Sequence, residues 1–163
     1  MGTRLRPLTN EKPKCMVEIE GQSIIAHQLN QFKHIKNAKV TIIGGYKVNK
    51  LKEKYNNVLE NVDYSKTNMV STLFTLPKEF WEDDKEDVII SYGDIVFEKE
   101  VLNLLVRSSG QISLVADKKW HPYWASRMSN PLDDAETFKT LNGFLIELGK
   151  KAINLKEIEA QYI

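Results

Sequence analysis

The residues best suited to chemistry lie near the start of the chain. Gly2 and Thr3 precede two arginines, Arg4 and Arg6, and Lys14 follows a proline. Glycine lets backbone amides approach an anion closely, while arginine and lysine neutralise phosphate oxygens through charge-assisted hydrogen bonds. These residue types in one short loop predict a phosphate-binding loop, and therefore nucleotide chemistry.

A carboxylate forms a second candidate position. Gly93 and Asp94 come almost directly after the apolar run 88–90. If that run is a parallel strand, Asp94 lies near its carboxyl end, where an open α/β sheet binds ligands. A carboxylate at that place is suited to hold Mg²⁺ that bridges nucleotide phosphates. We therefore predict that Asp94 is a metal ligand.

The N-terminal run resembles the signature of the nucleotidyltransferases that build activated sugars and activated cholines, Gly-x-Gly-Thr-Arg-Leu-x-Pro-Leu-Thr-x-x-x-Pro-Lys. This chain matches the signature at Gly2, Thr3, Arg4, Leu5, Pro7, Leu8, Thr9, Pro13 and Lys14. The resemblance implies that Gly2 and Thr3 approach a nucleoside triphosphate through their backbone and that Arg4 holds the leaving pyrophosphate. It also implies that Lys14 bridges toward the α-phosphate and the acceptor. In the same family a Gly-Asp pair follows a strand, which matches Gly93 at the nucleotide and Asp94 at Mg²⁺.

A third segment is similar to the phosphocholine cytidylyltransferase-like subgroup of that family. Its pattern of an aspartate, then Trp-x-x-x-Trp-x-x-Arg, then Asp-Ala-Glu occurs here as Asp117, Trp120, Trp124, Arg127 and 134–136. The resemblance implies an acceptor site, because aromatic faces attract a quaternary ammonium and arginine binds phosphate. The alternative is that two tryptophans four residues apart on a short helix pack against a sheet edge.

A helix start at 66–72 is the last candidate. In the cytidylyltransferase-like members a comparable asparagine at a helix start faces the base and ribose, so Asn68 and Ser71 are candidate nucleotide contacts. Alternatively, Thr67 or Asn68 only caps the helix.

The elements that must position these residues alternate along the chain. Hydrophobic spacing predicts helices at 22–35, 48–55, 68–76 and 101–106, and strands at 39–43, 58–62, 87–91 and 112–116. An Asn-Gly pair inside 138–151 predicts an antiparallel hairpin. We expect an α/β fold with a Rossmann-like, mixed but mostly parallel sheet flanked by helices. The resemblance implies the nucleotide-diphospho-sugar transferase fold.

The chain has 163 residues, of which 42% are hydrophobic, which suits one domain. In the family a strand and an earlier glycine precede the phosphate-binding loop, and a second metal-binding aspartate lies far downstream. We therefore expect 1–163 to be a single, incomplete nucleotidyltransferase domain whose first strand is missing.

Composition excludes several classes of partner. The chain has 23 basic and 22 acidic residues, so no net field favours nucleic acid or an anionic membrane. Cys15 is the single cysteine, and no apolar run is long enough for a membrane span. We expect a cytoplasmic protein.

The resulting functional hypothesis is a Mg²⁺-dependent nucleotidyltransferase. It joins a nucleoside triphosphate, with CTP favoured, to a small phosphorylated acceptor such as phosphocholine and releases pyrophosphate. One alternative is a sugar-1-phosphate nucleotidyltransferase. An alternative of another class is a non-catalytic nucleotide-binding or regulatory module, or a truncated product.

Overall fold

The computed structural model describes residues 2–82 and 86–162 as a mixed α/β protein of helices and small sheets. The chain divides into two compact units, Met1–Leu102 and Asn103–Ile163. The prediction of a single domain stays a prediction. The α/β class is confirmed, although each sheet formed by the described residues has only two strands.

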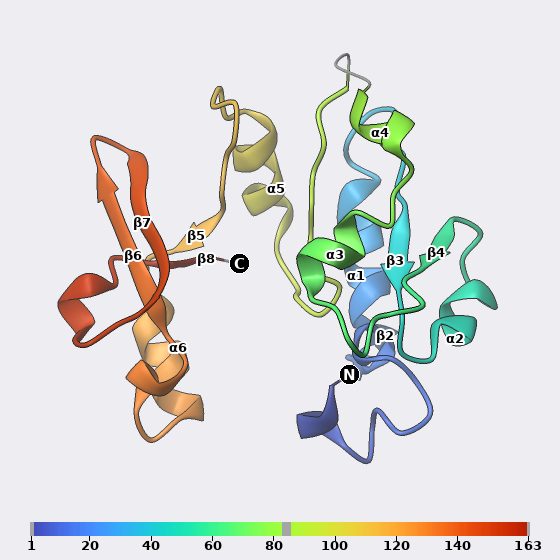
Figure 1. Ribbon diagram of the computed structural model, residues 1–163, viewed down its shortest axis with the longest axis horizontal. Coiled ribbons are helices and arrows are strands. Elements are labelled where there is room, and N and C mark those ends of the chain that lie inside the picture. The colour runs from blue at the N-terminus through green and yellow to red at the C-terminus, as the bar shows by residue number, and fades with distance from the viewer. Residues whose placement is uncertain (1, 83–85, 163) are drawn as a thin grey trace. The chain divides into compact units, whose positions relative to one another are not determined.

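Unit 1 begins with two short 3-10 helices, η1 and η2, and an antiparallel pair of short strands, β1 and β2. A helix and a strand then alternate until α4, and α5 spans the boundary between the units (Figure 1). The bounds are η1 Thr3–Leu5, η2 Lys14–Met16, β1 Glu18–Ile19, β2 Gln22–Ser23, α1 Ile24–Phe32, β3 Ile42–Gly44, α2 Val48–Lys52, β4 Val58–Glu60, α3 Met69–Leu73, α4 Lys78–Glu82 and α5 Lys99–Val106.

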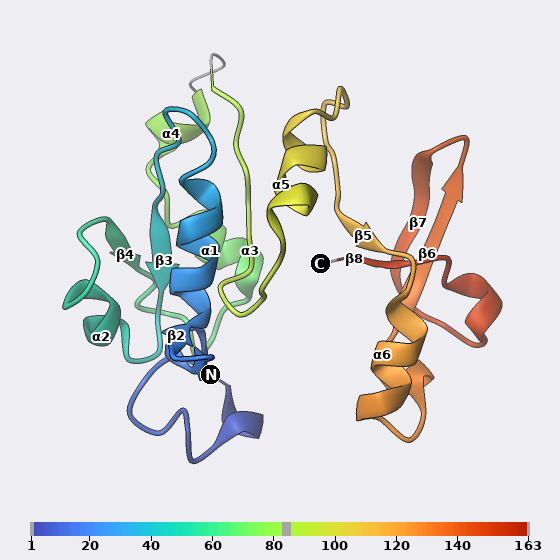
Figure 2. The ribbon, with the colours of Figure 1, turned by 180° about the vertical axis from the view of Figure 1, so that it is seen from behind.

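The core of unit 1 lies around β3 and the helices beside it. β3 pairs in parallel with β4, and Figures 1 and 2, drawn from opposite sides, place α3 and α1 on opposite sides of β3. A Cβ on Gly45 would lie 2.3 Å from the Tyr64 side chain, so only glycine allows the chain to leave β3 along this path. The buried apolar side chains of α1 and α2 are Ile24, Ile25, Val48 and Leu51.

The strand predicted at 87–91 is wrong. Within the described chain these residues pair with no strand, and Val88, Ile89 and Ile90 are 44%, 36% and 63% exposed. An apolar run favours burial, but a strand also needs a neighbour to satisfy its backbone groups. Among the described strands β3 has only β4 beside it, so the large parallel sheet is not formed.

Unit 2 consists of a hairpin, two short strands and one α-helix packed on them. The antiparallel hairpin predicted at 138–151 is confirmed, and Asn142 and Gly143 at its turn have φ of 53° and 82°. A two-residue turn with both φ positive matches the twist of the flanking strands. The bounds are β5 Ala116–Asp117, α6 Trp120–Arg127, η3 Pro131–Asp133, β6 Glu136–Leu141, β7 Phe144–Lys151, η4 Leu155–Glu157 and β8 Gln161–Tyr162.

Most of the other predicted elements exist, and they are mostly shorter than expected. The helices predicted at 22–35, 48–55 and 68–76 contract to α1, α2 and α3, whereas the helix predicted at 101–106 begins earlier, as α5. The prediction of a strand at 112–116 is wrong except at Ala116, which begins β5, and β5 pairs antiparallel with β8. Among the described helices none is both long and apolar enough to cross a membrane.

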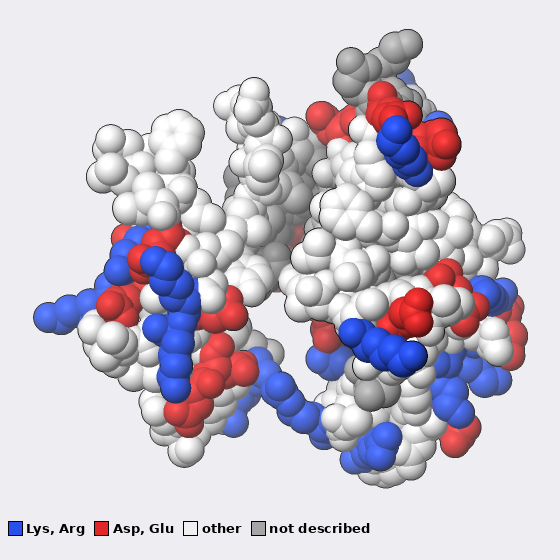
Figure 3. Space-filling model, in the orientation of Figure 1, with Lys and Arg blue, Asp and Glu red and all other residues white. Residues whose placement is uncertain are grey.

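The surface over α3 is largely uncharged in the view of Figure 3. The residues responsible are exposed apolar side chains on α3 and just after it, namely Met69, Val70 and Phe74.

Candidate active site

The N-terminal loop, residues 2–14, folds back on itself. Gly2 has a φ of 68°, and a Cβ there would lie 3.1 Å from the Cβ of Lys14. The hydroxyl of buried Thr9 donates to the Gly2 carbonyl at 2.8 Å, and the Tyr46 hydroxyl lies 3.0 Å from the carbonyl oxygens of Thr9 and Asn10. These contacts hold the glycine beside the lysine, as a compact phosphate-binding loop requires.

Lys14 and Asp94 form the central contact of the site. The Lys14 Nζ lies 2.5 Å from Asp94 Oδ2, although the residues are 80 positions apart. The two side chains are 40% and 37% exposed. An ion pair this exposed adds little to stability, so its interest lies in the chemistry of the two groups. The structure thus brings together the predicted lysine and the predicted metal ligand.

Arg4 and Thr3 lie on η1 and face solvent. Among the described residues Arg4 has no ion-pair partner, so its guanidinium is available to an anion. Gly93 packs beside the loop, and a Cβ added to it would lie 3.6 Å from the Cys15 Cβ, an ordinary contact. Sterics therefore do not require glycine at position 93.

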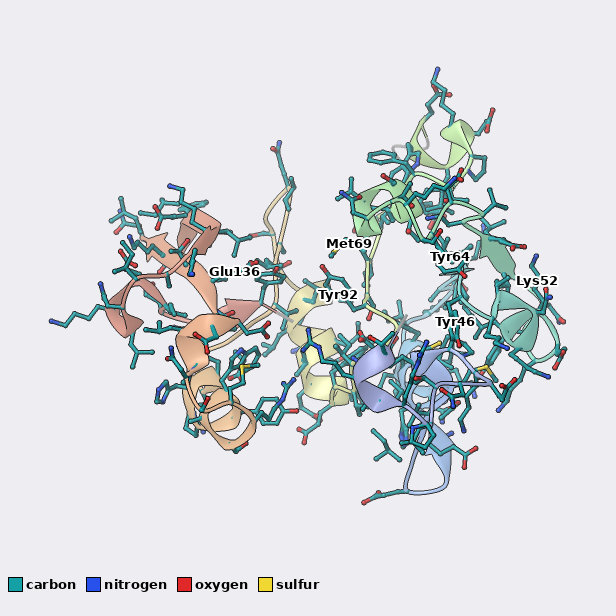
Figure 4. The ribbon with its side chains drawn as sticks, turned by 60° about the horizontal axis from the view of Figure 1, so that its bottom comes forward. Tyr46, Lys52, Tyr64, Met69, Tyr92 and Glu136 are labelled. Carbon is teal, nitrogen blue, oxygen red and sulfur yellow. The ribbon has the colours of Figure 1, made fainter. Side chains whose placement is uncertain are left out.

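Asn68 caps α3. Its Oδ1 accepts a hydrogen bond from the Ser71 amide at 3.0 Å and lies 3.3 Å from the Ser71 hydroxyl. The alternative that Asn68 caps the helix is confirmed, and the predicted nucleotide contact of Asn68 and Ser71 stays a prediction. Figure 4 shows Met69 next to Tyr92, whose hydroxyl lies 2.7 Å from the methionine sulfur.

The predicted acceptor residues all lie in unit 2. Trp120 is only 3% exposed and packs in a cluster with Ala135, Ala152 and Ile158. Trp124 packs edge-on against Trp120, with ring centroids 6.0 Å apart. Within unit 2 the two tryptophans therefore pack against each other and against the core, as the packing alternative predicts.

Arg127 lies close to two of the aromatic rings of α6. Its guanidinium carbon lies 5.2 Å from the Tyr123 ring centre and 5.6 Å from that of Trp124. Asp117, at the end of β5, accepts a hydrogen bond from the Lys119 amide at 2.7 Å and so shapes the turn into α6. An aromatic face that already holds a guanidinium is less available to a second cation.

Sequence reasoning missed Gln28, which lies on α1 and is 5% exposed. Its Nε2 donates to the carbonyl oxygens of Tyr92 and Ile95, at 2.6 and 2.7 Å. The sequence could have indicated this residue, because Gln28 stands at helical spacing from Ile24 and Ile25, on the apolar face of the predicted helix.

Asp94 stays a predicted metal ligand. No group of three or more His, Cys, Asp or Glu side chains able to hold a metal occurs among the described residues. Mg²⁺, however, is commonly bound through one or two carboxylates together with substrate phosphates and water. A single exposed carboxylate beside a phosphate-binding loop fits a metal that arrives with a nucleotide.

Cys15, between the two halves of this site, is expected to react slowly with alkylating reagents. Burial, reinforced by the charge of Asp94, raises its pKa from 9.0 to about 11. Because the thiolate is the nucleophile, alkylation by iodoacetamide at pH 8 should be about 100-fold slower than that of a free thiol of pKa 9.0. Mass spectrometry of the single modifiable thiol measures this rate, and a rate equal to that of the unfolded chain in urea would contradict it.

The same pKa shift has a consequence for stability. The Cys15 thiol ionises at a lower pH in the unfolded chain than in the folded one. Its contribution to the free energy of unfolding is therefore complete below pH 9.0 and is lost as the pH rises through about 11.

Comparison with known proteins identifies the family. The family described as nucleotidyl transferase matches residues 1–115. A CTP:phosphoglutamine cytidylyltransferase of Campylobacter jejuni is 42% identical over 171 residues, which cover 99% of this chain and 67% of that protein. No solved structure matches the chain.

Two more distant relatives belong to the same reaction class. A UTP–glucose-1-phosphate uridylyltransferase of Haloferax volcanii is 29% identical over 65% of this chain and 44% of its own length. A choline-phosphate cytidylyltransferase of Streptococcus pneumoniae is 29% identical over 67% of this chain and 48% of its own. This chain thus spans two thirds of the Campylobacter relative and under half of the other two. The resemblance seen in the N-terminal loop is confirmed: the chain belongs to the nucleotidyl transferase family.

Proposed function

We propose that this protein transfers a cytidylyl group from CTP to a small phosphorylated acceptor and releases pyrophosphate. The observation that carries the proposal is the Lys14–Asp94 pair at 2.5 Å, held beside a folded phosphate-binding loop. The likeness to a cytidylyltransferase over 99% of the chain supports CTP as the nucleotide.

The reaction needs no nucleophile from the protein. An oxygen of the acceptor phosphate attacks the α-phosphorus of CTP, a new P–O bond forms, and the bond to pyrophosphate breaks. Negative charge on the phosphoryl oxygens must be neutralised during this exchange. We assign this task to Lys14 at the α-phosphate and to Arg4 at the leaving pyrophosphate, with the Gly2 and Thr3 backbone at the triphosphate.

We propose that the reaction also uses a divalent metal, with Mg²⁺ as the first candidate. Asp94 would hold it, and the metal would supply charge neutralisation between the nucleotide phosphates. The Lys14 ammonium contacts Asp94 Oδ2 in this structure and has three donors, so it can keep that bond and also contact a phosphate oxygen. The pair therefore keeps the two groups side by side.

The base and ribose are assigned to the start of α3. Asn68 Oδ1 is occupied by Ser71, but within the described chain the Asn68 Nδ2 has no hydrogen-bond partner and can donate to a ligand. The Ser71 hydroxyl lies beside it, and both residues are exposed. Gly93 is proposed at the nucleotide through its backbone.

For the acceptor we propose a phosphorylated amino-acid amide such as phosphoglutamine. Trp120 is buried and the Trp124 ring already faces Arg127, so the two tryptophans offer little free aromatic surface to a quaternary ammonium. A guanidinium braced on two rings suits a phosphate or carboxylate instead. Asp117 and the tryptophans then shape the segment that presents Arg127. Phosphocholine is the second candidate, because a choline-phosphate cytidylyltransferase matches 67% of the chain.

Pyrophosphate release in the presence of Mg²⁺ tests both assignments. We expect CTP with phosphoglutamine to give a rate at least about tenfold above CTP with phosphocholine or any nucleotide with a sugar 1-phosphate, because one buried polar group left unsatisfied costs about 1–3 kcal/mol. Faster reaction with phosphocholine would favour the second candidate. Faster reaction with a sugar 1-phosphate would favour the alternative enzyme class, and CTP binding without release would favour a non-catalytic module.

We also propose that β3 and β4 belong to a larger, mostly parallel sheet, which their parallel pairing supports. The single cysteine and balanced charge support a cytoplasmic location.

A further inference from the structure

Gln28 is a buried amide in an otherwise apolar setting. The other buried residues of α1 are Ile24 and Ile25, and Gln28 itself is 5% exposed. Burying an amide is costly unless its hydrogen bonds are made. Both donors of the Gln28 side chain can be satisfied here, because its Nε2 lies 2.6 Å from the Tyr92 carbonyl oxygen and 2.7 Å from that of Ile95. The two carbonyls bracket Gly93 and Asp94.

The turn that carries Asp94 has few other supports. Among the described residues, no backbone–backbone hydrogen bond joins 92–95 to the rest of unit 1, and the segment belongs to no sheet. The other contacts of the segment are the Lys14 ammonium on Asp94, the Tyr92 hydroxyl on the Met69 sulfur and the Phe97 ring on Phe32, with centroids 5.8 Å apart. Phe32 is one helical turn beyond Gln28, so one face of α1 contacts the segment at several points.

The same helix also positions Lys14. α1 packs against η2, which contains Lys14, and the Ile24 amide at its start donates to the Val17 carbonyl at 3.0 Å. The helix therefore carries both partners of the Lys14–Asp94 pair, one through η2 and the other through the Gln28 amide.

We propose that Gln28 is a positioning residue, whose side-chain amide clamps the Tyr92–Ile95 turn and sets where Asp94 presents its carboxylate to a nucleotide-bound metal. The inference rests on the proposed function, because it assigns Asp94 to that metal. Partners that orient a metal ligand typically change metal affinity 10- to 100-fold when they are removed.

The test measures Mn²⁺ binding in the presence of CTP, by water-proton relaxation, on this chain and four variants. Gln28→Met keeps the length of the side chain and removes both donors, and we expect it to weaken Mn²⁺ binding about tenfold. Affinity for CTP without metal should stay unchanged. Ile25→Val is the matched control: it alters the same buried face of α1 without touching the turn, and it should bind Mn²⁺ like the parent chain. Asp94→Asn removes the proposed ligand.

A second measurement separates positioning from general loosening. Hydrogen exchange of the amides at 93–96 should speed up in Gln28→Met while the amides of α2 exchange as in the parent chain. Gln28→Glu, whose carboxylate would face two carbonyl oxygens, should weaken Mn²⁺ binding at least as much.

The outcomes are distinct. Unchanged Mn²⁺ binding in Gln28→Met, with binding lost in Asp94→Asn, overturns the inference and leaves the metal assignment standing. Unchanged binding in Asp94→Asn overturns the metal assignment itself. If neither Gln28 variant shows a cooperative thermal transition, the amide serves the fold as a whole, and the positioning role is rejected.

Discussion

Replacing Lys14 by methionine is expected to slow cytidylyl transfer by about 10²–10³-fold, the loss typical when one preorganised charge is removed from a reacting oxygen. Lys14 is the cation that the structure places beside Asp94, at 2.5 Å, and beside Gly2 of the phosphate-binding loop. Methionine keeps much of the side-chain stem, so packing against Gly2 should survive. Steady-state pyrophosphate release with CTP and phosphoglutamine measures the effect, which should fall mainly on kcat.

Lys12→Met provides the matched control. Lys12 belongs to the same loop and carries the same charge, but it has no ion-pair partner among the described residues. We expect this variant to retain kcat within about threefold, since one surface charge acts weakly across screened solvent. Equal losses in the two variants would mean that the loop contributes only general positive charge, and the specific role of Lys14 would be rejected.

The family could be predicted from the N-terminal loop because the residues that carry its signature are local. Gly2 needs a positive φ, Pro13 stiffens the approach to Lys14, and the basic residues lie within a few positions of one another. The sequence singled out Lys14 and Asp94 separately, by their places in the family's order, but their direct contact is seen only in the structure. Family membership is confirmed by comparison.

The sequence did not predict the features that depend on contacts between distant segments. The apolar run 88–90 was predicted as a central strand, but a strand needs partners on its edges, and the spacing of residues carries no information on whether they are present. The role of Gln28 depends on two carbonyls more than 60 positions away. A glutamine on an apolar helix face indicates only that some partner must exist.

The tryptophans of α6 illustrate the same limit. Their spacing fitted both an ammonium-binding cage and a packing role, because each requires aromatic rings one helical turn apart. The structure shows what surrounds each ring. Trp120 is enclosed by small and branched side chains of unit 2. The ring of Trp124 faces Arg127. The sequence alone could not rank these arrangements.

Replacing Trp120 by alanine is therefore expected to destabilise unit 2 by about 3–5 kcal/mol, the range for removing a large buried aromatic side chain. The cavity would open between Ala135, Ala152 and Ile158, and two of these are alanines too small to fill it. Urea unfolding followed by circular dichroism measures the change in the free energy of unfolding. The control is Trp81→Ala on α4, where the ring is 36% exposed and packs on Phe74 and Phe80, so about 1 kcal/mol is expected.

The variants Trp120→Ala and Trp81→Ala, together with Arg127→Gln, decide between packing and ligand binding at α6. If Trp120 serves the core, its loss should lower stability while Arg127→Gln, on a folded background, weakens binding of the acceptor and leaves stability within about 0.5 kcal/mol, as for most surface substitutions. Suppose instead that Trp120→Ala proves as stable as Trp81→Ala but loses phosphocholine binding. The ring would then have to reach a ligand from a position that is 3% exposed in this structure, which requires α6 to open. The cage would be supported and the phosphoglutamine assignment withdrawn, because a free aromatic face is what a quaternary ammonium needs.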